Sequence, residues 1–216
     1  MAPKASSTTH RLEAFSDGVI AIAITLLVLQ IDVPSASQGR LADELVDLWP
    51  SYVAFVLSFV VIGIMWVSHH SMFERIANVD RRLLFLNLLL LMGIAFLPFP
   101  TALLAEFAQQ GGENAKFSAA TYSLTMAIIG VFFVVMWHHL YRHPELLVEG
   151  IGPERARTAM IRSLVGPIVY ALSIGLAFVS PEACFVVYAL IAVYFAAGPS
   201  SRVATPDEVR EDTEEP

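Results

Sequence analysis

The sequence has few of the residues that covalent cross-links, metal clusters or a solvated surface require. Its one cysteine, Cys184, has no partner for an internal disulfide and cannot form a cysteine-rich metal site. Charged residues make up only 15% of the 216 positions, whereas a soluble domain carries about 25%. Hydrophobic residues make up 56% and are gathered in long runs. These proportions exclude an ordinary soluble domain and predict an all-α polytopic membrane protein, because a chain crossing hydrocarbon must satisfy its backbone within helices.

The net charge of −7 comes largely from the end of the chain. Residues 199–216 hold six acidic side chains against two arginines, so we expect an acidic, disordered cytoplasmic tail there. Residues 1–10 are expected to form a short cytoplasmic tail as well. No segment is basic enough to predict a nucleic-acid partner.

Hydropathy predicts six transmembrane helices between residues 11 and 198. Pro98 and Pro100 are expected to bend the third helix or end it early, and the sixth span is near the short limit for crossing a bilayer. The predicted spans are Leu12–Ile31, Tyr52–Met72, Leu83–Phe107, Phe117–Tyr141, Ala159–Val179 and Ala183–Ala197.

The distribution of basic residues predicts the orientation of these spans. With the N-terminus inside, the inner segments hold eleven Lys and Arg residues and the outer loops only Arg40 and Lys116. The positive-inside rule therefore places both termini in the cytoplasm of a multi-pass cell-membrane protein. Residues 4–37 also have features of a cleaved signal peptide, but Asp17 fits that interpretation poorly.

Polar residues of the first four spans fall near one depth, at the cytoplasmic end. Polar groups in a low dielectric attract one another, which predicts a linked network. Arg11 and Asp17 are six residues apart and do not share a helix face, so their partners are expected on other helices, with His69 and Asn87 as candidates. A simpler alternative is that Ser16 and Asp17 cap a helix N-terminus. The polar residues at this depth are Ser16, Asp17, His69, His70, Asn87, His138 and His139; the outer half of the first three spans is almost purely apolar.

One face of the first helix carries an apolar stripe. Ile22, Leu26 and Leu29 recur at helical spacing, with Thr25 beside them. A small-residue strip of Ala14, Gly18 and Ala21 runs alongside and favours close helix packing. Taken alone, such a stripe usually faces lipid or another helix.

The octet Arg11–Gly18 resembles a known signature. Arg11, Phe15, Ser16 and Asp17 match the Arg-x-x-x-Phe-Ser-Asp motif of the endosomal and lysosomal potassium channels, the transmembrane protein 175 family, and the resemblance looks closest to its bacterial branch. The resemblance covers roughly residues 11–101 and extends to Trp66-x-x-His69-x-x-x-Phe73, Leu86-Asn87-Leu88 and Phe96-Leu97-Pro98-Phe99.

The resemblance implies a modestly potassium-selective channel formed by a homotetramer in the lipid bilayer. The first helix would line the pore, with Ile22, Leu26 and Leu29 as constricting rings and Thr25 near the narrow part. No Thr-Val-Gly-Tyr-Gly filter is present, so partial dehydration of the ion at apolar rings would supply selectivity. The resemblance also assigns a motif and inter-helix network, made of Arg11, Phe15, Ser16, Asp17, His69 and Asn87.

Three other functions remain open on sequence alone. A secondary transporter is the strongest of them, although only the third span is interrupted by prolines and no second half mirrors it. An intramembrane hydrolase is disfavoured, because the chain has no His-Glu-x-x-His and no Gly-x-Ser-x-Gly motif. We therefore expect no enzymatic activity, no cofactor and no bound metal. A purely structural membrane protein would explain the hydropathy but not the polar layer.

Overall fold

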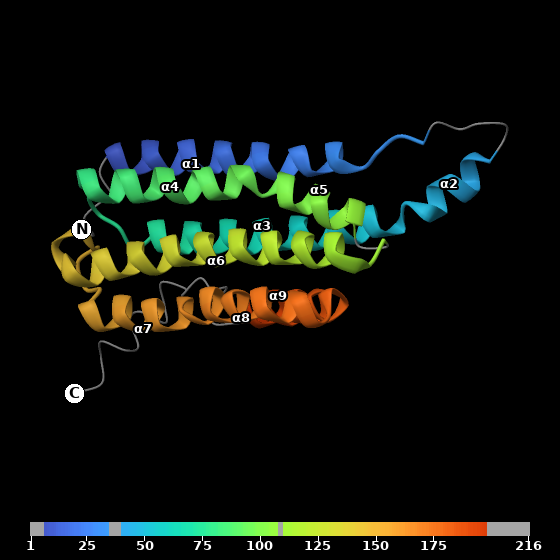
Figure 1. The fold of residues 1–216 in the computed structure, drawn as a ribbon. Coiled ribbons are helices and arrows are strands. Elements are labelled where there is room, and N and C mark those ends of the chain that lie inside the picture. The colour runs from blue at the N-terminus through green and yellow to red at the C-terminus, as the bar shows by residue number, and fades with distance from the viewer. Residues whose placement is uncertain (1–6, 35–39, 108–109, 198–216) are drawn as a thin grey trace.

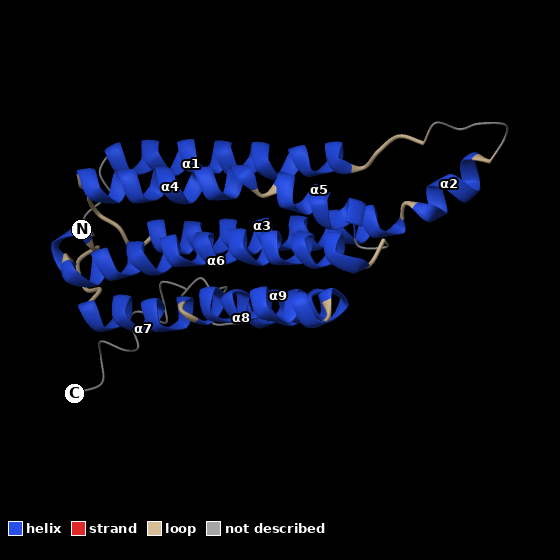
Figure 2. Cartoon of the chain, in the orientation of Figure 1, coloured by secondary structure: helices blue, strands red, loops and turns tan. Residues whose placement is uncertain are grey.

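The computed structural model describes residues 7–34, 40–107 and 110–197, and regular structure in these ranges is almost entirely helical (Figure 2). The exception is one isolated antiparallel bridge between Ile76 and Leu147. In chain order the helices are α1 (Ser7–Leu26), η1 (Leu27–Gln30, a 3₁₀ turn), α2 (Leu41–Asp47), α3 (Trp49–Phe73), α4 (Arg81–Phe96), α5 (Pro98–Phe107), α6 (Gly112–Arg142), η3 (Pro144–Leu146, a 3₁₀ turn), α7 (Pro153–Ser163), α8 (Val165–Val179) and α9 (Pro181–Ala197).

Five helical segments are long and apolar enough to cross a membrane. They are Ser7–Gln30, Trp49–Phe73, Arg81–Phe107, Gly112–Arg142 and Pro153–Val179. The sixth predicted span corresponds to α9, which has 17 residues. At about 1.5 Å per residue, α9 is a few ångströms shorter than a hydrocarbon core of about 30 Å. The number of six spans therefore stays a prediction.

The first span starts earlier and ends differently from the prediction. Helix α1 begins at Ser7, inside the segment expected to be a tail, and the Thr9 hydroxyl donates to the Ala77 carbonyl at 3.1 Å. This contact fixes the first turn against the loop between α3 and α4. After Leu26 the α-helix tightens into the 3₁₀ turn η1, so Leu29 lies outside the regular α-helix. The predicted acidic tail, 199–216, lies outside the described residues.

The third span is broken where the prolines predicted. Helix α4 ends at Phe96, and α5 begins at Pro98. A proline lacks the amide hydrogen that the helix needs and its ring crowds the preceding turn, so the chain restarts a helix at this residue.

The helices form layers (Figure 1). Helices α1 and α4 lie on one side, α3 and α6 in the middle, and α7, α8 and α9 on the opposite side. Helices α6 and α8 cross closely, because a Cβ added to Gly130 would lie 2.8 Å from the ring of Pro167. This crossing joins the last helices to the middle layer.

Two loops and a capped helix close one end of the bundle. The amide of Ala77 donates to Leu146 at 2.8 Å, and the amide of Val148 donates to Arg75 at 3.0 Å. Asp80 caps α4 by accepting from the Leu83 amide at 2.7 Å, and it also contacts the His139 ring at 2.9 Å. Although partial burial acts to raise it, the pKa of Asp80 lies below its usual value because both contacts favour the carboxylate.

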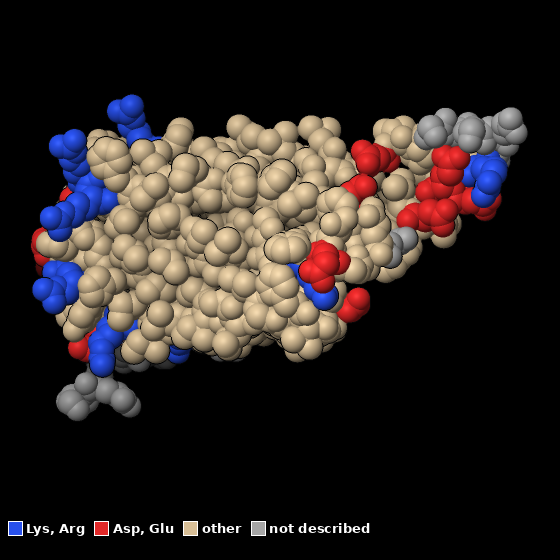
Figure 3. Space-filling model, viewed as in Figure 1, with Lys and Arg blue, Asp and Glu red and all other residues tan. Residues whose placement is uncertain are grey.

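Charge separates the two ends of the molecule (Figure 3). Eight of the ten described Lys and Arg side chains belong to segments at this closed end, and the other two are Arg40 and Lys116 at the opposite end. Between the ends the visible surface is almost uncharged. We call the arginine-rich end the basic end.

Candidate functional site

Helix α1 has two unlike faces. One is packed into the bundle and carries Leu12, Ser16, Ile20, Ala23 and, in η1, Leu27. The opposite face is uncovered. Its apolar stripe is exposed, with Ile22 61%, Leu26 41% and Leu29 70% accessible, and Thr25 is exposed beside it. The stripe therefore has no partner within the described part of the chain.

On the packed face, three predicted site residues meet at full burial. Asn87 of α4 donates from Nδ2 to the Ser16 hydroxyl at 2.9 Å, and its Oδ1 lies 2.9 Å from Nε2 of His69 on α3. Ser16 donates to the Leu12 carbonyl at 2.9 Å. Because the amide oxygen can only accept, His69 carries its proton on Nε2. The donors thus run in one direction, from His69 through Asn87 and Ser16 to the backbone.

The second nitrogen of His69 is the one buried side-chain nitrogen or oxygen without a hydrogen-bond partner among the described residues. The ring stacks on Phe73 with centroids 4.3 Å apart. With Nε2 protonated, Nδ1 holds a lone pair beside an aromatic ring. We call the set His69, Asn87 and Ser16 the motif network.

Asp17 is joined to Trp66, which belongs to a motif of the resemblance but not to the predicted network. Its Oδ1 accepts from the indole nitrogen of Trp66 at 2.9 Å, so its hydrogen-bond partner is neither His69 nor Asn87. The physical reason is helix rotation: Ser16 and Asp17 are 100° apart on α1, so Ser16 faces α4 while Asp17 faces α3. Glu13, on the same side as Asp17, lies 3.0 Å from Nδ1 of His70.

The signal for Trp66 was present in the sequence. An indole nitrogen within an apolar helix needs an acceptor, and Trp66 lies one turn before His69. His70 was among the polar residues expected at this depth, whereas Glu13 had no signal, because an acid near a helix end is equally compatible with solvent.

Arg11 and Phe15, the other two motif residues, are not part of these contacts. Phe15 is 52% exposed and Arg11 is exposed. The structure records no hydrogen bond or ion pair between the Arg11 side chain and any other described residue. Of the predicted network, the structure therefore brings together Ser16, Asn87 and His69. It attaches Asp17 to α3 through Trp66 and leaves Arg11 and Phe15 outside.

The outer half of the spans is less apolar than the sequence suggested. Ser58 of α3 lies 2.8 Å from the Thr101 hydroxyl of α5 and 3.4 Å from the Tyr122 hydroxyl of α6. Thr101 in turn donates to the Leu97 carbonyl at 2.9 Å. Single hydroxyl residues in apolar helices form no sequence pattern, which is why this cluster was missed.

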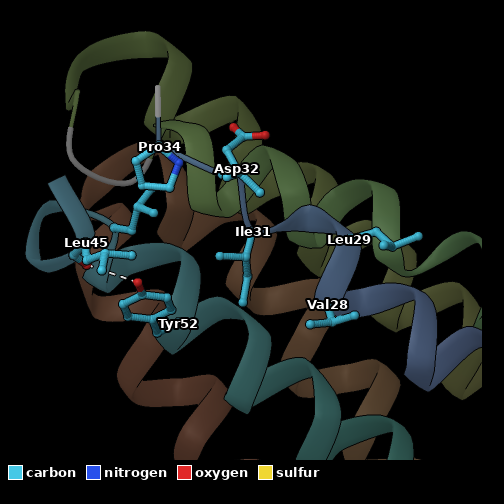
Figure 4. A pocket seen from close by; sticks show the side chains of 9 residues that line it. Val28, Leu29, Ile31, Asp32, Pro34, Leu45 and Tyr52 are labelled. Atoms are coloured by element: carbon cyan, nitrogen blue, oxygen red, sulfur yellow. Dashed lines mark hydrogen bonds between the residues drawn. The ribbon is translucent and has the colours of Figure 1, made fainter. Parts of the chain in front are cut away.

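An open groove lies where α1 leaves the bundle (Figure 4). It has a volume of about 620 Å³ and is formed by η1, the chain after it, α2 and the start of α3. Tyr52 donates to the Leu45 carbonyl at 3.0 Å across it. Leu29 belongs to its lining, and the Asp32 carboxylate points away from Ile31.

Comparison with known proteins identifies the family. The family model described as the endosomal/lysosomal potassium channel TMEM175 matches residues 11–98. A potassium channel of Streptomyces collinus is 48% identical over 186 residues, which cover 86% of this chain and 90% of that protein. A potassium channel of Chamaesiphon minutus is 40% identical over 193 residues, covering 88% and 94%. The chain belongs to the TMEM175 family.

A solved structure supports the same assignment for the fold. The crystal structure of a lysosomal potassium-selective channel TMEM175 homolog from Chamaesiphon minutus matches with a TM-score of 0.81 and 38% identity, covering 91% of this chain and 100% of that one. This TMEM175 chain is therefore a multi-pass membrane protein of a cation-channel family. The matched residues 11–98 contain the motif network, Trp66 and the exposed stripe.

Proposed function

We propose that this protein is a subunit of a modestly potassium-selective channel in which α1 lines the pore. The observation that carries the proposal is the contrast between the two faces of α1. Its packed face is held by the motif network, and its opposite face presents Ile22, Leu26 and Leu29 uncovered. A helix anchored from behind in this way can present a fixed apolar surface to an axis shared with other subunits.

One helix cannot enclose a pore, so several copies are required. The chain holds one Arg-x-x-x-Phe-Ser-Asp motif, and closed cyclic symmetry is the common solution for a homo-oligomer. We propose a homotetramer around α1. Gly18 supports close contact at the axis, because no atom lies within 4 Å of a Cβ built on it.

Selectivity in such a pore would come from the cost of dehydration. An apolar ring gives a passing ion no replacement for lost water, and potassium holds its water less tightly than sodium does. Thr25 offers partial compensation. Its hydroxyl hydrogen is directed at the carbonyls of Ala21 and Ile22, at 3.0 and 2.9 Å, so an oxygen lone pair remains for a cation.

The charge distribution supports a cytoplasmic location for the basic end. By the positive-inside rule, this end and the N-terminus face the cytoplasm. The Asp32 side of the molecule then faces outward. Permeating potassium ions and the lipid bilayer are the partners that this arrangement requires.

Cation flux into liposomes tests the proposal. Purified protein is reconstituted, and uptake driven by a potassium gradient is compared with uptake driven by a sodium gradient. We expect larger flux for potassium, and we expect Ile22→Asn to raise total flux and reduce the preference, because an amide wets the constriction. Ile128→Asn is the matched control, since Ile128 is an exposed isoleucine on α6. Equal effects of the two variants, or no change with Ile22→Asn, would remove Ile22 from the pore.

A further inference from the structure

Helices α7 and α8 form a nearly continuous rod that is longer than a bilayer core. The segment Pro153–Val179 has 27 residues, which at about 1.5 Å per residue exceeds a core of about 30 Å by roughly two helical turns. Val179 lies at the turn into α9, where Glu182 is the one charged side chain, whereas α7 carries Arg155, Arg157 and Arg162, so the surplus falls at the start of α7. The first turns of α7 therefore lie at the depth of lipid headgroups.

This rod carries one exposed apolar stripe. Ile161, Ile168 and Leu172 follow one another at helical spacing and are all exposed, and Leu172 is 71% accessible. Arg157 lies one turn before Ile161 on the same side of the helix, and Arg162 directly follows Ile161 and lies about 100° around the helix from it, so the two guanidinium groups flank the start of the stripe. Arginine at this boundary extends its guanidinium toward the headgroups while its stem stays on apolar surface.

Arg157 and Arg162 are weakly neutralised within the described part of the chain. For comparison, Lys116 at the outer end lies 2.8 Å from Glu113, whereas Arg40 has only a loose contact, 3.9 Å from Asp43. The Arg162 side chain forms no ion pair or hydrogen bond with any other described residue. Arg157 has one loose contact, 3.7 Å from an exposed Glu154. Guanidinium groups in this state favour an external anion, and phosphate is the anion that their planar donors fit best.

We propose that Arg157 and Arg162 bind the phosphate of an anionic phospholipid whose acyl chains lie along Ile161, Ile168 and Leu172. A phosphate directly above an exposed apolar stripe matches an amphiphile rather than a free ion. The site faces away from α1, because α7 and α8 lie on the opposite side of the bundle (Figure 1). It therefore remains open to lipid in any assembly that has α1 on its axis, and it does not depend on conduction.

Native mass spectrometry of the full-length protein in detergent tests the proposal. Phosphatidylglycerol and phosphatidylcholine with identical acyl chains are added in turn, and bound lipid is counted. We expect the wild type to retain more phosphatidylglycerol, and we expect the double variant Arg157→Gln/Arg162→Gln to lose most of this preference. Two arginines near an anionic headgroup correspond to about a thirtyfold change in affinity. The double variant Arg157→Lys/Arg162→Lys keeps the charge and should retain the preference in part.

The matched control removes the same charge from the other end. Arg40→Gln/Lys116→Gln should keep the preference for phosphatidylglycerol unchanged. Equal loss in both Gln double variants would mean that only net charge matters, and it would overturn the site. Displacement of the lipid by inorganic phosphate at equal concentration would reassign the arginines to a free anion. A further variant lacks the acidic residues 199–216. If this variant retains more phosphatidylglycerol, and if adding Arg157→Gln/Arg162→Gln to it changes nothing, a different surface binds the lipid and the proposal is wrong.

Discussion

The two sides of this bundle are held together by different chemistry. On the α1 side, α1, α3 and α4 are joined by the motif network, in which an imidazole, an amide and a hydroxyl are linked in one direction. On the far side, α6 and α9 are joined by the hydroxyls of Ser123 and Tyr188, 2.7 Å apart, and α6 meets α8 through the Gly130–Pro167 crossing. The first arrangement fixes orientation, and the second permits close packing.

The difference follows from the donors available. An amide has separate donor and acceptor atoms, so Asn87 fixes both the tautomer of His69 and the direction of the chain. A hydroxyl can rotate and serve either role, so the Tyr188 cluster tolerates small shifts between helices. A helix that must hold an exposed face in a defined direction needs the first kind of joint.

The largest expected effect comes from Asn87→Ala, which removes the centre of the motif network. The substitution leaves the Nε2 hydrogen of His69 buried without an acceptor and opens a cavity. We therefore expect the free energy of unfolding to fall by about 3 kcal/mol. The measurement is the midpoint of thermal unfolding in detergent. Asn78→Ala, in the exposed loop before α4, should change the midpoint little. Similar shifts in both variants would refute a special role for Asn87.

The crossing on the far side gives the next effect. Gly130→Ala places a methyl group 2.8 Å from the rigid ring of Pro167, and we expect a loss of about 2 kcal/mol from overpacking. Gly18→Ala is the comparison, because a Cβ at Gly18 meets nothing within 4 Å in the subunit. A loss of oligomer with normal subunit unfolding in Gly18→Ala would place Gly18 at a contact between copies.

An effect of similar size is expected for Tyr188→Phe. The Tyr188 hydroxyl donates to the Ala119 carbonyl at 3.0 Å and lies 2.7 Å from Ser123, and its removal costs about 1 kcal/mol per lost hydrogen bond. The aromatic packing against Tyr122 and Tyr170 remains. Thermal unfolding of Tyr188→Phe and Asn87→Ala in parallel compares the two sides directly. An equal loss from both would contradict the distinction drawn here.

The smallest effect is expected for Asp17→Asn. The amide oxygen of asparagine can still accept from the Trp66 indole, so we expect the free energy of unfolding to change by less than about 0.5 kcal/mol. Trp66→Phe removes the donor and leaves a half-buried carboxylate without its partner, and it should cost about 1 kcal/mol more. Recovery of oligomer by size-exclusion chromatography measures both variants. A larger defect in Asp17→Asn would show that the charge itself, and not the hydrogen bond, is what α1 requires.

The sequence alone determined the membrane-spanning character, the approximate position of the spans and the level of the polar residues. Hydropathy is a property of local stretches, and the distance of a residue from a helix end follows from its number in the chain. The break at Pro98 was predictable for the same reason, since a proline acts on its own helix. The motif Arg11–Asp17 identified the family without any knowledge of contacts.

Only the tertiary structure decided which side chains meet. A rotation of α1 by one residue position, 100°, would exchange Ser16 and Asp17 between α4 and α3, and the motif is the same in either case. Packing of the apolar face sets that rotation, and it therefore decides that Ser16 meets Asn87 while Asp17 meets Trp66. The same packing brings Ser58 to Thr101 and Tyr122. Contacts between helices depend on the rotation and register of both partners, and neither quantity is written in the sequence of one helix.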